Sequence, residues 1–372
     1  MVDAPRPADR TGERILFTPG PLTTSATVRG AMGIDIGSWD IDCIDVVADI
    51  RQGLLSLAGG ADDLTCVLFQ GSGSFGVEAA LGSAIPRDGK LLVLVNGAYG
   101  QRICSMATTL GIQHSIARDP EDRPHDPERL EAALREDPEI THVACVHCET
   151  TTGILNPLRE LGLAVERQGR SLIVDAISTF GGYPCGPGEA IDFNAGPIDH
   201  LIGSTNKCIE GVPGFNFILS RAGAMERCRG QARSLCLDMY DQWRVLEDSG
   251  KFRYTPPTHV LLAFRQALLE LEQEGGVAAR AARYANNHRV LTQGMSALGY
   301  RCFVPTEWQS HIITSFCHPD AGFDFKGFYD RLHAAGFIIY PGKVTETETF
   351  RIGTIGAIDS RHIELLLEAI AG

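Results

Sequence analysis

One lysine stands in the stretch "STNKCIEGVPG" (204–214), between small polar residues and a glycine-rich run. It is Lys207, and the apolar segment "HLIGS" (200–204) before it has the composition of a buried strand. At the end of such a strand, in a partly desolvated pocket, a lysine has a lowered pKa and can act as nucleophile and base. A lone lysine is more often a solvated surface charge. The residues around Lys207 must therefore distinguish between these two interpretations.

An acidic residue occupies a comparable position earlier in the chain. The apolar run "SLIVDA" (171–176) brings Asp175 to its C-terminal end. In open parallel sheets ligands bind beyond the carboxyl ends of the strands. A carboxylate there loses hydration unless a cation meets it, which a protonated cofactor ring could provide. An arginine or a helix cap is the other possible partner.

A third candidate feature is the stretch "FQGSGSFGVEAA" (69–80), in which a glycine-serine turn joins a strand to an amphipathic helix. Backbone N–H groups at the helix start, with the hydroxyls of Ser72 and Ser74, could bind a phosphate. Gly71 and Gly73 allow the backbone to approach the ligand closely. The same residues could equally form an ordinary cap and turn.

Pyridoxal phosphate requires these three features together: a lysine for the cofactor aldehyde, an acid for its ring nitrogen and an anion site for its phosphate. Tyr99, in "NGAYGQR" (96–102), follows the apolar run 90–95 and could lay its ring on the pyridine, or could belong to the core.

Composition limits the other possibilities. The formal net charge is −13, from 33 Lys and Arg against 46 Asp and Glu, which argues against the basic surface of a nucleic-acid-binding protein. No run of about eighteen apolar residues occurs, and the start of the chain (1–14) has charges and prolines where a signal peptide has an apolar segment. The sequence therefore predicts a cytoplasmic protein without a membrane contact.

The 11 cysteines are scattered singly through a long chain, which favours reduced, mostly buried thiols. Cys145, His147 and Cys148 form the one cluster that suggests a metal. Their spacing lacks a matching second pair, and a buried strand end with small thiols explains it as well, so no metal is expected.

Alternation of strands and helices must position these residues. Segments with helical periodicity (75–85, 99–111 and 157–169) lie between apolar runs, which predicts an α/β fold with a mostly parallel buried sheet flanked by helices. The runs predicted as strands are 64–69, 90–95, 142–147, 171–176, 200–204 and 214–220.

The pattern changes after "YTPPTHV" (254–260), where one long helical stretch is expected, followed by a smaller α+β unit. In that unit we expect strands at 310–318, 337–342 and 349–356, and helices at 324–336 and 359–371. The predicted organisation is a loose tail (1–14), a large domain (15–257) and a small C-terminal domain (258–372).

In wording and order, motifs along nearly the whole chain resemble those of the fold-type I, class-V aminotransferases, the group that includes the alanine–glyoxylate and serine–pyruvate enzymes. The matching stretches are "LFTPGPLTTS" (16–25), "FQGSGSFGVEA" (69–79), "NGAYGQR", "HCETTTGILNP" (147–157), "VDAISTFGG" (174–182), "STNKCIEGVPGF" (204–215), "FRYTPPTH" (252–259), "YPGK" (340–343) and "FRIGTIG" (350–356).

The resemblance implies a role for each matching residue. Lys207 would be the Schiff-base lysine and Asp175 the partner of the ring nitrogen. Arg351 would grip the substrate's acid group, near Gly20 on the substrate side, although a surface ion pair is the alternative for this arginine. The remaining cofactor contacts would come from Ser72, Gly73, Ser74, Tyr99, Thr152 and Ser178, and from Tyr254 and Thr258 of a neighbouring subunit in a homodimer with shared active sites.

Within the family, the likeness is closest to enzymes that use an aminophosphonate, which implies transamination of 2-aminoethylphosphonate with pyruvate. An alanine– or serine–glyoxylate activity, or a substituted aminophosphonate, is the alternative, and a pyridoxal phosphate-binding regulator or a nicotinamide enzyme a more distant one. Two stretches depart from the family pattern and could alter the donor: 176–206, which reads as containing an inserted loop, and 32–43.

Overall fold

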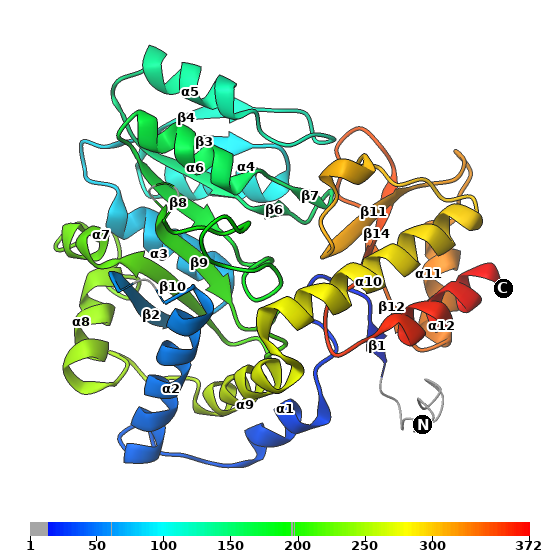
Figure 1. Cartoon of the computed structure of the whole chain (residues 1–372), viewed down its shortest axis with the longest axis horizontal. Helices are drawn as coiled ribbons and strands as arrows, with labels where there is room; N and C mark the ends of the chain where they lie inside the picture. Colours follow the sequence, from blue (N-terminus) through cyan, green and yellow to red (C-terminus); the bar gives the residue numbers. More distant parts are fainter. Residues whose placement is uncertain (1–13, 61, 195, 197) are drawn as a thin grey trace.

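The computed structural model describes residues 14–60, 62–194, 196 and 198–372. Figure 1 shows two lobes, a larger one built on a twisted sheet and a smaller one that contains the C-terminus, with helix α10 running from one to the other. Of the predicted N-terminal tail, residues 1–13 lie outside the described residues.

A seven-stranded sheet forms the larger lobe, in the order β2-β10-β9-β8-β5-β3-β4. Only β10 runs antiparallel to its neighbours, β2 and β9, so the prediction of a mostly parallel sheet is confirmed. Six strands correspond to the predicted apolar runs: β2 (Leu64–Gln70), β3 (Lys90–Val95), β5 (Ile140–Val146), β8 (Ser171–Asp175), β9 (Ile198–Ser204) and β10 (Phe215–Arg221). The seventh, β4 (Gln113–Arg118), was not predicted because it is a partly exposed edge strand with polar residues.

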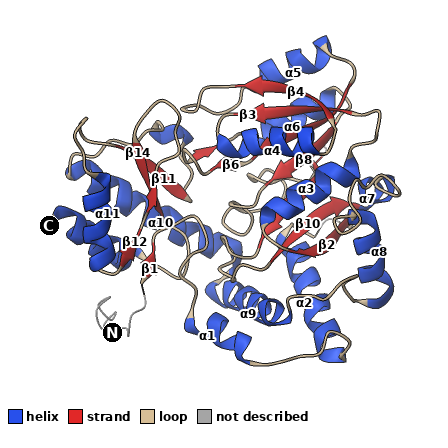
Figure 2. Ribbon diagram, turned by 180° about the vertical axis from the view of Figure 1, so that it is seen from behind, coloured by secondary structure: helices blue, strands red, loops and turns tan. Residues whose placement is uncertain are grey.

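Helices pack against this sheet, and residues of β8 and β9 are buried almost throughout, as expected for strands covered on both faces. Figure 2 shows the helices around the sheet from behind. The helices of this lobe are α1 (Ala26–Gly30), α2 (Ile41–Leu57), α3 (Gly73–Ala84), α4 (Ala98–Thr109), α5 (Pro127–Glu136), α6 (Leu158–Arg167), α7 (Ala222–Arg227), α8 (Met239–Ser249) and α9 (Thr258–Glu274).

The smaller lobe contains a three-stranded antiparallel sheet of β11 (Ile313–Cys317), β14 (Thr349–Gly353) and β13 (Tyr340–Pro341). Helices α11 (Phe325–Ala334) and α12 (Ser360–Ala371) cover an aromatic core that includes Phe316, Phe328 and Phe350. The short strand β1 (Ile15–Leu16) pairs in parallel with β12 (Phe337–Ile338), so the first described strand packs into this C-terminal core. The division of the chain at residue 258 stays a prediction.

The long helical stretch expected after residue 260 is two helices, which corrects the prediction. Helix α9 ends at Glu274 and α10 (Gly276–Ala297) begins two residues later. Gly275 between them has φ +110°, a left-handed conformation that ends a helix and is open mainly to glycine. The remaining short strands are β6 (Cys148–Glu149) and β7 (Ile154–Leu155).

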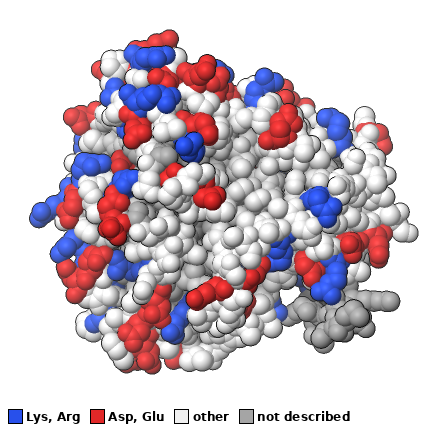
Figure 3. Space-filling model, in the orientation of Figure 1, with Lys and Arg blue, Asp and Glu red and all other residues white. Residues whose placement is uncertain are grey.

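Charges of both signs are interspersed on the face seen in Figure 3. Among the described residues, no helix is both long and apolar enough to span a bilayer. All 11 cysteines are free, and most of them are buried.

Candidate active site

A cavity of about 560 Å³ opens beyond the carboxyl ends of β8 and β9, beside the first turns of α3 and α4. This is the place where ligands bind in open α/β sheets. The structure brings most of the predicted site residues to its wall, namely Gly20, Ser72, Gly73, Ser74, Tyr99, Asp175, Ser178 and Lys207.

Lys207 follows β9, and its Nζ donates a hydrogen bond to the carbonyl oxygen of Gly20 over 2.8 Å. Burial lowers the pKa of this ammonium to about 8, although the charge of Asp175 acts in the opposite direction. A lysine of this kind is deprotonated in part near neutral pH, as a nucleophile and base requires. The alternative of a solvated surface lysine does not fit its burial.

Asp175 is the last residue of β8, and its Oδ1 accepts a hydrogen bond from the backbone N–H of Ile177 over 3.0 Å. Burial raises the pKa of the carboxyl to about 6, and the charge of Glu149 adds to the shift. Within the described residues no ion pair reaches this carboxylate. A protonated ring nitrogen would supply the missing cation, so Asp175 fits the predicted cofactor.

The first turn of α3 faces the cavity with its backbone N–H groups. Ser72 is the N-cap residue, but its side chain makes no capping hydrogen bond, so the hydroxyl is available for a ligand. A Cβ added to Gly73 would lie 2.4 Å from the Cδ1 of Ile177, which explains the need for glycine there. The helix start therefore fits a phosphate better than a simple cap.

Tyr99 lies in the first turn of α4, whose N-terminus is held by the buried carboxylate of Glu149. Glu149 accepts hydrogen bonds from the backbone N–H groups of Tyr99 (3.0 Å) and Gly100 (3.3 Å). Burial raises the pKa of Glu149, while hydrogen bonds from Thr151 and the helix start act against that rise. This acid was not singled out from the sequence, and it holds the backbone of the helix start from which Tyr99 projects.

Among the three consecutive threonines after Glu149, Thr150 lines the cavity and Thr152 does not. The hydroxyl of Thr152 donates to the carbonyl oxygen of Glu149 over 3.2 Å, within its own turn. The predicted contact of Thr152 with the cofactor stays a prediction. Ser178 lines the cavity, and its hydroxyl donates to the carbonyl oxygen of Cys148 over 3.2 Å.

Arg351 comes from β14 in the smaller lobe and is 3% exposed, so it is not a surface ion pair. Its Nε donates to the carbonyl oxygen of Pro341 and its Nη1 to that of Thr150, both over 2.9 Å. Because Thr150 lines the cavity, these bonds bring the guanidinium to the cavity edge. Its positive charge contributes to the lowered pKa of Lys207, after burial and other charges.

Tyr254 and Thr258 do not line the cavity of this chain. Tyr254 is 40% exposed, and Thr258 is the first residue of α9. The side chain of Gln70 donates to the carbonyl oxygen of Thr255 over 3.0 Å, which keeps this segment beside the end of β2. Their predicted contact with a neighbouring subunit's cofactor stays a prediction.

Arg102 is a cavity residue that sequence reasoning missed. Its Nη1 donates to the hydroxyl of Ser74 over 3.1 Å, and its guanidinium lies 4.7 Å from the centre of the Tyr99 ring. The spacing of three residues from Tyr99 on one helix could have indicated that both share a face. No ion pair with Arg102 occurs within the described ranges, so its charge is open to an anionic ligand.

Of the two stretches that depart from the family pattern, 32–43 contributes no lining residue, whereas 176–206 contributes Ile177, Ser178, Ser204 and Asn206 near its two ends. The described residues between 183 and 197 do not line the cavity. Near the suspected metal cluster, the Nδ1 of His147 is 2.9 Å from the hydroxyl of Thr179, and burial lowers the pKa of the imidazole to about 3. In the part of the chain that the structure describes, no group of three or more candidate ligands gathers around a metal position.

The sheet, the buried lysine and acid and the open helix start define a pyridoxal phosphate-dependent transferase of fold type I. The family model of the class-V aminotransferases matches residues 34–336. The chain therefore belongs to the class-V aminotransferase family, as the motifs predicted.

Curated relatives agree with this assignment over nearly their whole length. The chain is 52% identical to a 2-aminoethylphosphonate–pyruvate transaminase of Syntrophobacter fumaroxidans, over 95% of both chains. It is 47% identical to a transaminase of the same description from Pseudomonas putida, over 96% of both chains.

Solved structures support the fold. An alanine–glyoxylate aminotransferase from Nostoc sp. has a TM-score of 0.88 at 24% identity and covers 100% of this chain and 96% of its own. A ureidoglycine–glyoxylate aminotransferase from Bacillus subtilis has a TM-score of 0.87 at 23% identity, with coverage of 96% and 92%. The predicted fold class is thus confirmed.

Proposed function

We propose that the chain transfers the amino group of 2-aminoethylphosphonate to pyruvate, with phosphonoacetaldehyde and alanine as products. Two curated relatives, 52% and 47% identical over nearly the full length, are described as transaminases for this pair of substrates. The structural observation that carries the proposal is a pair of guanidinium groups, one from each lobe: Arg102 lines the cavity with Lys207, and Arg351 donates to Thr150 on the cavity wall. One guanidinium group can bind a carboxylate through two hydrogen bonds, whereas a phosphonate dianion is bound more strongly by two guanidinium groups.

When bound, pyridoxal phosphate supplies the aldehyde that receives the amino group and a ring that withdraws electrons. Lys207 would move the proton at the amine-bearing carbon of the donor. Asp175 would keep the ring nitrogen protonated, and Tyr99 would cover the ring. Ser72, Gly73 and Ser74 would bind the phosphate through the start of α3. Arg351, at the cavity edge, holds the acid group of the substrate.

A comparison of amine donors tests the substrate. Purified holoenzyme is mixed with 2-aminoethylphosphonate, alanine or serine, and the loss of the bound cofactor's absorbance is followed in each mixture. We expect the aminophosphonate to react much faster than serine, and alanine to be formed when pyruvate is then added. A faster reaction with serine and glyoxylate would show that the substrate assignment is wrong.

We also propose a homodimer in which Tyr254 and Thr258 reach the partner's cofactor phosphate. In the single chain Tyr254 is 40% exposed and Phe75, in the first turn of α3, is 51% exposed, although both are large apolar side chains. Burial of such residues on association is favourable. Light scattering at working concentration tests the proposal, and a fully active monomer would contradict it.

A further inference from the structure

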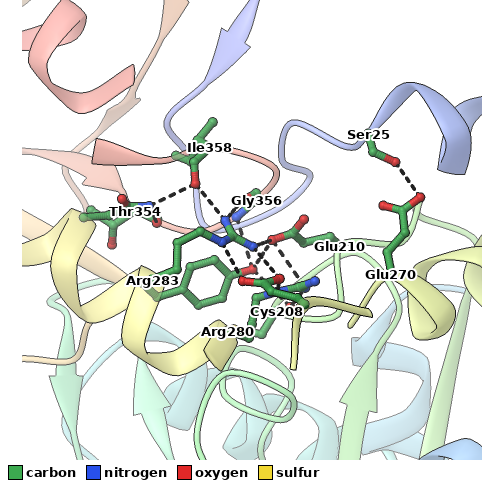
Figure 4. Close-up of polar contacts among 12 residues, drawn as sticks. Ser25, Cys208, Glu210, Glu270, Arg280, Arg283, Thr354, Gly356 and Ile358 are labelled. Atoms are coloured by element: carbon green, nitrogen blue, oxygen red, sulfur yellow. Dashed lines mark hydrogen bonds and ion pairs between the residues drawn. The ribbon is translucent and has the colours of Figure 1, made fainter. Parts of the chain in front are cut away.

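A buried cluster of charged and polar side chains lies between the loop of Lys207 and the strand of Arg351 (Figure 4). We call it the bridging cluster, and most of its members project from the first turns of α10. Arg280 is 2% exposed, Tyr284 is fully buried and Glu210 is 5% exposed. The members are Glu210, Glu274, Arg280, Arg283, Tyr284 and Asn287.

On one side, the cluster holds the turn that carries Lys207. The backbone N–H of Glu210 donates to the carbonyl oxygen of Lys207 over 2.8 Å. Glu210 has φ +65°, and among the described residues it is the one non-glycine residue in that region. Such a conformation costs roughly 1–3 kcal/mol and persists only where its surroundings enforce it.

Side chains from α10 hold the turn of Glu210 in this conformation. The Nη1 of Arg280 donates to the carbonyl oxygen of Cys208 over 2.8 Å. The hydroxyl of Tyr284 donates its one hydrogen to Oε1 of Glu210 over 2.6 Å, and its oxygen also lies 3.1 Å from the carbonyl oxygen of Cys208. The residue next to Lys207 is therefore tied directly to this helix.

On the other side, the same helix holds the loop that follows β14. The Nη1 of Arg283 donates to the carbonyl oxygens of Gly356 and Ile358, both over 2.7 Å. The Nδ2 of Asn287 donates to the carbonyl oxygens of Thr354 (3.1 Å) and Ile358 (3.2 Å). Because Thr354 directly follows the strand that contains Arg351, α10 also fixes the position of that strand.

Ion pairs join the two sides within the cluster. The Nη2 of Arg283 donates to Glu210 over 2.7 Å and its Nε to Glu274 over 2.8 Å. The planar fork of an arginine can satisfy several acceptors in one fixed geometry, which a lysine cannot. A buried ion pair adds little net stability compared with apolar packing, but it does specify geometry.

We propose that Arg280, Arg283 and Asn287 are positioning residues that set the spacing between the ammonium of Lys207 and the guanidinium of Arg351. A substrate held by its acid group at Arg351 would then present its reacting carbon to Lys207 at the correct distance. The inference rests on the roles proposed above for these two residues. A misplacement of about 1 Å at such a site can cost about 100-fold in rate.

Two variants separate the two sides of the cluster. Arg280→Lys weakens the contacts of the cluster with the turn of Lys207. Asn287→Ser weakens its contacts with the loop that follows the strand of Arg351. Arg289→Lys is the matched control, because Arg289 lies on the same helix and, among the described residues, its side chain donates hydrogen bonds only to Gln293 and Asn286. For each holoenzyme we would measure Tm, the pH midpoint of the bound cofactor's absorbance, and kcat and KM for pyruvate.

We expect Arg280→Lys to shift the pH midpoint and to lower kcat about tenfold, with KM within about twofold of the native value. We expect Asn287→Ser to raise KM for pyruvate about tenfold while the pH midpoint stays native. The control should match the native protein in every measurement. If both variants lower only Tm, and the midpoint, kcat and KM stay native, the cluster is a stabilising element and the proposal is wrong.

These measurements test the positioning proposal separately from the proposed function. A native protein inactive with 2-aminoethylphosphonate and pyruvate would contradict the function, while the absorbance midpoint of Arg280→Lys would still test the positioning. If either variant does not fold, Arg283→Lys replaces it, since Arg283 contacts both sides and should change midpoint and KM together. A folded Arg283→Lys variant with native values of both would also overturn the proposal.

Discussion

The ammonium of Lys207 donates a hydrogen bond to the carbonyl oxygen of Gly20 over 2.8 Å, although the two residues are 187 positions apart in the chain. Gly20 has φ +103°, and a Cβ there would lie 2.6 Å from the Cδ of Lys207 and 2.3 Å from the carbonyl oxygen of Asn206. The N-terminal segment therefore forms a wall against which the lysine rests.

Substitution Gly20→Ala should displace Lys207, because the added methyl group overlaps its side chain and the left-handed backbone disfavours alanine. We expect kcat/KM to fall by about 100-fold or more, with cofactor content retained. Gly30→Ala is the control, since no atom lies within 4 Å of an added Cβ there and Gly30 has no positive φ. Steady-state kinetics of the cofactor-loaded proteins measures this effect. Native activity in Gly20→Ala would contradict the close approach of Gly20 to the side chain of Lys207.

Removal of the lysine amine in Lys207→Ala should lower kcat by more than about 10³-fold, because both the nucleophile and the proton carrier are lost. Borohydride should attach the cofactor covalently to the native protein and leave the variant unlabelled, as mass spectrometry of the peptide containing residue 207 would show. A variant that turns over at the native rate would remove Lys207 from the mechanism.

Asp175→Asn should affect activity and stability in opposite directions. Burial raises the pKa of the Asp175 carboxyl from 3.8 to about 6, so the folded apoprotein binds this proton more tightly than the unfolded chain does. The resulting stabilisation is fully present below about pH 4 and is lost as pH rises through about 6. At about pH 8 the buried charge should cost on the order of 3 kcal/mol.

The amide introduced by Asp175→Asn carries no such charge, so this variant should have, as apoprotein, a higher Tm than native apoprotein at about pH 8 and no advantage at about pH 4. The kcat of the loaded variant should fall about 100-fold or more, because the ring nitrogen loses its anionic partner. Equal Tm differences at both pH values would contradict the raised pKa.

Arg102→Met should weaken binding of the aminophosphonate more than binding of pyruvate. Loss of one charge-assisted contact corresponds to about a 10- to 100-fold rise in KM for the donor, and Arg102→Lys should restore part of it. The KM for pyruvate should change by no more than about threefold. If instead cofactor affinity falls and the donor KM stays native, Arg102 acts on the cofactor phosphate through Ser74.

Much of the site could be predicted because its residues follow local rules. Asp175 ends one buried strand, Lys207 follows another by three residues and Ser72 precedes a helix, so strand and helix signals placed all three at one edge of the sheet. Arg102 lines the cavity because it shares a face of α4 with Tyr99, and its spacing of three residues from Tyr99 was the one signal for this in the sequence. Thr150 and Thr152 have the same side chain, and the conformation of their turn determines that Thr150, and not Thr152, lines the cavity.

The bridging cluster could not be predicted at all. Its residues come from the loop of Lys207 and from the end of α9 and the first half of α10, which follow that loop by more than sixty residues in the sequence. Arg280 and Arg283 read as ordinary solvated charges of a helix, and the break at Gly275 is what turns them inward. Packing between distant segments, rather than local preference, determines such a cluster.

The pairing of β1 with β12 has a consequence for the order of assembly. Ile15 leaves the ribosome long before its partner Phe337 is made. The central sheet contains every strand it needs by Arg221, but the strand that precedes Gly20 can pair only after Phe337 and Ile338 have emerged. The pocket should therefore be completed only after Phe337 has been made, and a product truncated before that residue should be inactive.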